Sequence, residues 1–236
     1  MRRMPTLHLD KVRETIATLR LRVEERFPGS GLAGIVAELE RTAAEVPRQV
    51  RAMHRPIWWV WALVAFTILV LGSVMVLLAS SVRVQGTPTW TEMAQGLDAI
   101  TSELALMIGV VVFLAGWQTR LRRNRVVAAV RRLRELAHIV DMLQLTKDPG
   151  GAAGVSLPAT AHSPRRDLSP KELERYLDYC AELLSLTAKV AQFYVADFDD
   201  ADATAAVTDL EDMTNGLSGK IWQKIMIIDR HRHPGR

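Results

Sequence analysis

The sequence predicts an all-α protein with two membrane-spanning helices and a helical bundle on one side of the membrane. Three observations lead to this prediction. Residues 57–80 carry no charge, a second apolar segment is followed by a cluster of arginines, and apolar residues elsewhere recur every three or four positions. That spacing is typical of helices, whereas strands need alternation at every second position. No stretch alternates in that way, so we expect no sheet.

The first expected element is a helical hairpin within residues 1–47. Two apolar runs with helical spacing flank the sequence FPGSG, whose Pro and Gly favour a turn. The runs are Leu9, Val12, Ile16, Leu19 and Val23, then Leu32, Val36, Leu39, Ala43 and Val46. We expect two antiparallel helices, with Pro47 and Pro56 bracketing a short basic connector to the first membrane span.

Residues 57–80 are predicted to form the first span. A bilayer core requires about 20 consecutive apolar residues in a helix, and this segment exceeds that length. Trp58, Trp59 and Trp61 lie at its start, where aromatic side chains commonly anchor a helix at the membrane interface. We therefore expect a spanning helix.

The second span is predicted at about residues 99–118, although its uncharged run, Leu104 to Trp117, is short. Arginines decide the assignment, because they flank both spans on one side and are rare in the connection between the spans. Those that follow the second span are Arg120, Arg122, Arg123 and Arg125. By the positive-inside rule both termini are cytoplasmic. Most basic residues are arginines, as in GC-rich bacterial genomes, so we expect a bacterial inner membrane.

A heptad seam begins before the second span. A capping box at Thr89 to Glu92 predicts a helix start, and we expect one helix from Trp90 to Leu143. Its seam, a candidate oligomer or helix-packing surface, comprises Trp90, Met93, Leu97, Ile100, Leu104, Met107, Val111 and Leu114. Ala105, Gly109 and Gly116 form a stripe of small residues that permits close helix packing. The stripe could serve the first span or a second copy of the chain.

The remaining segments are expected on the cytoplasmic side. Residues 126–146 extend the second span, residues 147–168 form a flexible linker, and residues 169–236 form a helical pair that begins with a capping box at Ser169 to Glu172. Neither the N-terminal hairpin nor the C-terminal pair is broad enough to fold alone. We expect them to pack together as a bundle.

No motif for nucleotide binding, zinc proteolysis, serine hydrolysis or kinase chemistry is present, and we expect no catalytic residue, metal or cofactor. Glu103 is the candidate for a pore or for proton coupling, because acids at membrane depth often line ion paths. The alternative is an interfacial acid that reaches outer water. His138 and Asp141 are too few for a metal site, and the acidic run at 197–202 lacks the Gly and Glu of a calcium loop.

These features predict a non-enzymatic inner-membrane protein that forms homo-oligomers. Its cytosolic bundle would act as a scaffold, sensor or interaction module for a cytosolic protein partner. The alternative is a homo-oligomeric ion channel or membrane-disrupting effector whose second span lines the pore. The four arginines after the second span are expected to contact lipid headgroups. Nucleic acid is a disfavoured partner, because stacking aromatic residues are absent from the basic segment.

Overall fold

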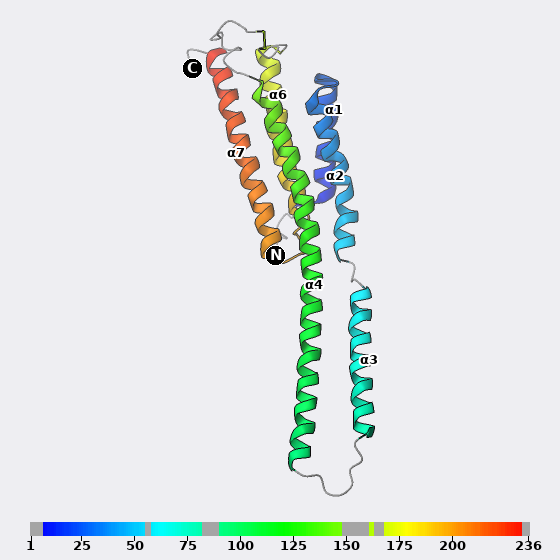
Figure 1. Cartoon of the computed structure of the whole chain (residues 1–236). Coiled ribbons are helices and arrows are strands. Elements are labelled where there is room, and N and C mark those ends of the chain that lie inside the picture. Colours follow the sequence, from blue (N-terminus) through cyan, green and yellow to red (C-terminus); the bar gives the residue numbers. More distant parts are fainter. Residues whose placement is uncertain (1–6, 55–57, 82–89, 148–160, 163–167, 233–236) are drawn as a thin grey trace, which may run out of the picture. The chain divides into compact units, whose positions relative to one another are not determined.

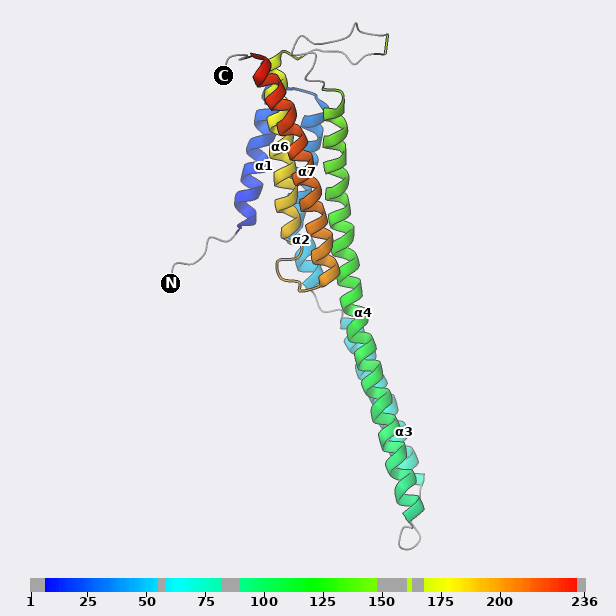
Figure 2. The same ribbon diagram turned by 90° about the vertical axis from the view of Figure 1, so that its left-hand side faces the viewer.

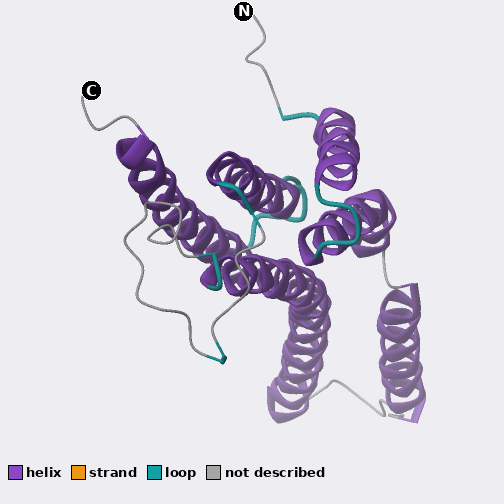
Figure 3. Cartoon of the chain, turned by 90° about the horizontal axis from the view of Figure 1, so that it is seen from above, coloured by secondary structure: helices purple, strands orange, loops and turns teal. Residues whose placement is uncertain are grey.

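The computed structural model describes residues 7–54, 58–81, 90–147, 161–162 and 168–232. Within these residues every regular element is a helix, which confirms the all-α prediction (Figures 1 and 3). The helices are α1 (Leu9–Arg26), α2 (Gly31–His54), α3 (Trp58–Ser81), α4 (Trp90–Leu145), α6 (Pro170–Gln192) and α7 (Ala201–Arg232). The predicted linker falls largely on residues 148–160 and 163–167, which lie outside the described residues.

The chain divides into two compact units. Unit 1 comprises Met1–Met53 and Arg125–Arg236, and unit 2 comprises His54–Asn124. Helix α4 belongs to both, because its 56 residues run without interruption from Trp90 to Leu145. The helix expected from Trp90 to Leu143 is therefore present and is two residues longer. The capping residue Thr89 lies outside the described residues.

Helices α1 and α2 are joined by a tight turn. Helix α1 ends where the amide of Phe27 donates to the carbonyl of Val23 at 2.8 Å, and Gly29 then adopts a left-handed φ of 66°. Glycine adopts this conformation without steric cost. Ser30 begins α2, because its Oγ accepts a hydrogen bond from the amide of Ala33 at 3.2 Å.

The connector that we expected between Pro47 and Pro56 is helical as far as His54, because α2 continues through Pro47. Proline has no amide hydrogen and cannot donate to the carbonyl of Ala43, at a cost of about 3 kcal/mol in a helix interior. Val46 and Met53, on either side of Pro47, are nevertheless buried in the core. Burying each such side chain contributes about 1.5–3 kcal/mol, so packing offsets the proline.

Helices α6 and α7 each begin at a side-chain cap. The predicted capping box is present before α6: Ser169 Oγ accepts from the amide of Glu172, and the Glu172 carboxylate accepts from the Ser169 amide at 2.8 Å. Before α7, the buried Asp200 accepts from the amide of Ala203 at 2.9 Å. The acidic run at 197–202 thus supplies a helix cap.

The core of unit 1 contains buried residues from α1, α2, α4, α6 and α7. Helix α6 contacts both α1 and α7 and lies between them (Figure 2). Phe27 at the end of α1 packs edge-to-face on Tyr176 of α6, with ring centroids 5.4 Å apart. Helix α4 contributes Val126, Val130, Leu133, Ala137 and Val140. The second half of α4 is therefore part of the core, in addition to the four helices expected from the sequence.

Unit 2 contains α3 and the first part of α4, which run antiparallel (Figure 1). Its apolar side chains are largely exposed, including Phe66 and Leu69 on α3 and Phe113 on α4. Among the described residues, one helical segment, Ala94–Leu145, is long and apolar enough to cross a membrane, and only 6% of its most apolar window is buried. Ala62–Val74 is a shorter apolar segment. The side chains of Trp59 and Trp61 are outside the description.

Candidate functional site

The candidate site is a groove on unit 1 between α2 and the second half of α4. At one end of the groove the two helices lie close together. A Cβ added to Gly31 would lie 2.9 Å from Cδ2 of Leu143, so the absence of a side chain permits this approach. Toward the other end of α2, the helices border two adjoining hollows that share Gln49, Ala129 and Arg132.

The first hollow has a volume of about 370 Å³ and an excess of acidic side chains. Its lining residues are Glu38, Arg41, Thr42, Glu45, Gln49, Ala129, Arg132, Glu135, Leu136, Ile139 and Tyr194. Glu38 forms an ion pair with Arg41. Within the described part of the chain, Glu135 and Arg132 form no ion pair. These two opposite charges are therefore available to a ligand.

A hydrogen-bonded chain of side chains forms one wall of this hollow. The phenol of Tyr194, which is almost completely buried, donates to Oε1 of Gln49 at 2.9 Å. Nε2 of Gln49 then donates to the carboxylate of Glu45 at 3.0 Å. Burial, together with the nearby Glu45 charge, raises the pKa of Tyr194 to about 12. Tyr194 therefore remains a neutral donor that fixes the orientation of Gln49.

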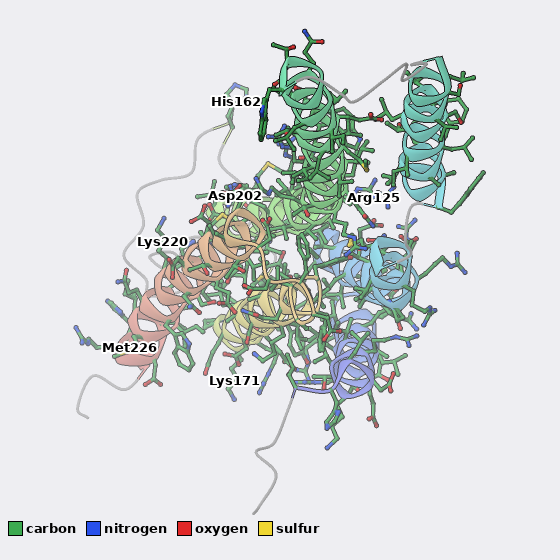
Figure 4. The ribbon with its side chains drawn as sticks, turned by 90° about the horizontal axis from the view of Figure 1, so that it is seen from below. Arg125, His162, Lys171, Asp202, Lys220 and Met226 are labelled. Carbon is green, nitrogen blue, oxygen red and sulfur yellow. The ribbon has the colours of Figure 1, made fainter. Side chains whose placement is uncertain are left out.

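The second hollow has a volume of about 520 Å³ and is lined by two arginines but no acid. Its lining residues are Gln49, Ala52, Met53, Arg125, Ala128, Ala129 and Arg132. Three of these are alanines, whose short side chains leave the space open. Arg125 (Figure 4) also donates to the carbonyl of Ala52 at 3.5 Å, so part of its role is to cap the end of α2.

The sequence-predicted residues are distributed differently. Glu103 lies on the unit 2 part of α4 and is half-buried, and in the described residues it has no hydrogen bond or ion pair. Of the four arginines expected at lipid headgroups, Arg120 and Arg125 are exposed, whereas Arg122 and Arg123 are half-buried. Only Arg125 contributes to the groove. The lipid contacts remain a prediction.

The predicted seam is mostly exposed on α4. Trp90, Leu97, Ile100, Leu104 and Val111 are exposed, Met107 is half-buried, Leu114 is buried, and the side chain of Met93 lies outside the description. The small-residue stripe of Ala105, Gly109 and Gly116 is also exposed, and a Cβ added to either glycine would meet nothing within 4 Å. The described residues therefore leave this face available to lipid or to another protein.

Other polar candidates have local structural roles. Gln144 is buried, and its Nε2 donates to the carboxylate of Asp141 at 2.7 Å, while Lys224 Nζ donates to the backbone carbonyl of Gln144 at 2.8 Å. His138 is exposed. Cys180 is fully buried, and this burial raises the pKa of its thiol to about 12, which suppresses thiolate reactivity. No cluster of three or more metal-binding side chains occurs in the described ranges.

Sequence reasoning missed the groove residues Gln49, Arg132 and Tyr194 as a group. Tyr194 lies four positions after the core residue Val190, so helical spacing alone marks it as buried. Its hydrogen-bond partner lies 145 residues away in the sequence, which no local pattern indicates. Comparison with protein-family models, curated proteins and solved structures finds no match to this chain.

Proposed function

We propose that this chain is a non-enzymatic protein of the bacterial inner membrane that presents a cytoplasmic helical bundle to a protein partner. In this proposal, α3 and the first part of α4 cross the bilayer as a hairpin, and unit 1 is the interaction module. Both termini are cytoplasmic, and the connection between the spans is outside. The membrane lipid and other copies of the chain contact the exposed face of unit 2.

One observation carries this proposal: the same helix has an exposed apolar half and a half built into a protein core. Leu104 is 53% exposed, whereas Leu133 on the same helix is 0% exposed. Soluble monomers rarely expose apolar patches larger than a few hundred Å², so a second apolar environment is needed. The arginines that flank the apolar segments favour a membrane with the bundle on the cytoplasmic side.

Cysteine labelling in intact bacterial cells tests this topology. Cys180 is the single cysteine, so Cys180→Ala provides a thiol-free background at a buried position where alanine is small enough to fit. In that background we expect Gly86→Cys, in the predicted outer connection, to react with a membrane-impermeant maleimide. We expect Ala205→Cys, exposed on α7, to react only after the cells are permeabilised. Equal labelling of both positions in intact cells would refute the topology.

A homo-oligomeric channel is the second candidate function, and Glu103 is the observation that favours it. This acid interrupts an otherwise apolar face of α4 and has no partner in the described part of the chain. An unpaired acid at membrane depth is costly unless it faces water or a proton path. The channel version predicts that Glu103→Gln alters ion flux into proteoliposomes. Equal flux in both proteins, at equal copy number measured by mass in nanodiscs, would eliminate it.

A further inference from the structure

The two hollows form one groove whose charge changes sign along its length. The hollow at the end near Glu38 is lined by three glutamates and two arginines, Arg41 and Arg132, so acids are in excess there. At the end near Met53, two arginines line the groove and no acid does. From Ile139 to Arg125, α4 advances 14 residues, or about 21 Å at 1.5 Å per residue. This length corresponds to about four helical turns of an occupant.

The residues at the bottom of the groove are apolar, and the alanines among them have small side chains. Ala128 and Ala129 lie between the two arginines of α4, and Leu136 and Ile139 continue the same lining toward the acidic end. Small side chains permit another helix to approach closely, and amphipathic helices commonly bind by placing an apolar face in such a groove. Charged side chains beside an apolar surface favour a ligand that carries both charged and apolar side chains.

A lipid headgroup does not fit this position well under the proposed topology. Ala128 is 11 residues beyond Trp117, which corresponds to about 16 Å along α4. The headgroup layer adds only about 5–8 Å on each side of the hydrocarbon core. The centre of the arginine-lined hollow therefore lies beyond the layer that headgroups occupy.

A second copy of the chain is also a poor occupant. Copies inserted in the same membrane with the same topology are related by an axis along the membrane normal. That symmetry places the arginine-lined end of one groove beside the arginine-lined end of the other. The like charges would then repel each other rather than match.

We propose that this groove binds an amphipathic helix of a cytosolic partner, with acidic residues toward Arg125 and Arg132 and basic residues toward Glu38, Glu45 and Glu135. This inference rests on the proposed function, because it specifies the partner surface of the cytoplasmic bundle. Arg132 pairs with an acidic side chain of the partner, Glu135 pairs with a basic one, and the alanines receive its small apolar face. The Tyr194–Gln49–Glu45 chain holds the wall of the groove in place.

A designed peptide tests this inference directly. The probe is a fluorescent 18-residue helical peptide with an alanine-leucine face, glutamates in one half and lysines in the other half. A control peptide has the same composition but alternates the two charges along its length. Fluorescence anisotropy with the full chain in nanodiscs measures binding. We expect the probe, whose glutamates and lysines lie in separate halves, to bind at least about tenfold more tightly than the control peptide. The loss of one or two charge-assisted hydrogen bonds implies a difference of this size.

Matched variants distinguish the groove from general surface charge. Ala128→Leu fills the hollow without changing charge, and Arg132→Glu reverses one charge, so each is expected to weaken binding about tenfold. The controls are Ala205→Leu, an exposed alanine on α7, and Arg131→Glu, an exposed neighbour that does not line the groove. Both controls are expected to bind as the parent does. A peptide in which only the glutamate facing position 132 is replaced by lysine, with the other glutamates kept for Arg125, is expected to recover binding to Arg132→Glu.

Three results would overturn the inference. They are no binding of the probe peptide at about 100 µM, equal binding of both peptides, or equal losses in Arg131→Glu and Arg132→Glu. Circular dichroism melting of each variant establishes that the chain is folded. The labelling experiment in cells separates this inference from the proposed function. A chain that is inserted correctly but does not bind the peptide contradicts only the proposed peptide binding by the groove. A chain that binds the peptide but is not inserted contradicts the membrane proposal.

Discussion

The two halves of α4 carry the same kind of apolar spacing but bury it differently. In unit 1, Val126, Val130 and Leu133 lie in a core built from five helices. In unit 2, Leu97, Ile100 and Leu104 are exposed. A repeat of three and four residues therefore identifies one face of a helix, but it does not identify what covers that face. The charge pattern around each half provides that second piece of information.

The largest expected difference in stability between the two halves of α4 appears when one leucine in each half is replaced by alanine. Leu133→Ala removes a fully buried side chain and is expected to lower the free energy of unfolding of unit 1 by about 2–5 kcal/mol. Leu104→Ala, on the exposed half, is expected to change this free energy by less than about 0.5 kcal/mol. Denaturant unfolding of the full chain in detergent, followed by circular dichroism, compares the two. Equal destabilisation would show that the exposed half is also packed in a protein core.

A smaller effect is expected from the polar groups. Tyr194→Phe removes the hydrogen bond to Gln49 and leaves the Gln49 carbonyl oxygen without its donor, so we expect a loss of about 1 kcal/mol. Glu103→Gln in unit 2 removes no hydrogen bond present in the described residues and is expected to leave the unfolding of unit 1 unchanged. The same denaturant titration measures both variants. If Tyr194→Phe has the same free energy of unfolding as the parent, the wall of the groove does not depend on this hydrogen bond.

The smallest expected effect is a pH dependence at the start of α6. Hydrogen bonds from the Ser169 side chain and amide hold the pKa of Glu172 below its usual value of 4.5. A lowered pKa in the folded state contributes stability that is present above pH 4.5 and is lost as the pH falls through the folded value. We therefore expect the protection of the amides in the first turn of α6, relative to their intrinsic exchange rate at each pH, to decrease below pH 4.5.

Ser169→Ala provides the control for this pH effect. It removes the side-chain partner of Glu172, so the difference in amide protection between pH 6 and pH 4, corrected for the intrinsic exchange rate at each pH, is expected to shrink. Hydrogen exchange measured by mass spectrometry on peptides from residues 168–180 supplies the comparison. A pH dependence that is the same in both proteins would exclude Glu172 as its source.

Local sequence signals predicted the helices well, because they depend on contacts within a few residues. The capping box at Ser169 and the turn at Gly29 are of this kind. The sequence around Pro47 predicts a connector, whereas the structure has a helix, because the burial of Val46 and Met53 offsets the cost of the proline and that burial depends on distant helices. The groove was missed for the same reason, since α2 and α4 face each other across more than 70 residues of intervening chain.

Unit 1 is assembled from both ends of the chain, and this has a consequence for the timing of synthesis. The ring of Phe27 stays uncovered by Tyr176 until the ribosome has synthesised that residue, which lies 149 positions later in the chain. At a ribosomal rate of about 5–20 residues per second, this delay is roughly 7–30 s. Throughout that interval the apolar face of the first hairpin is uncovered while the apolar segments of unit 2 are being made. A chaperone or the insertion machinery therefore has access to both at once.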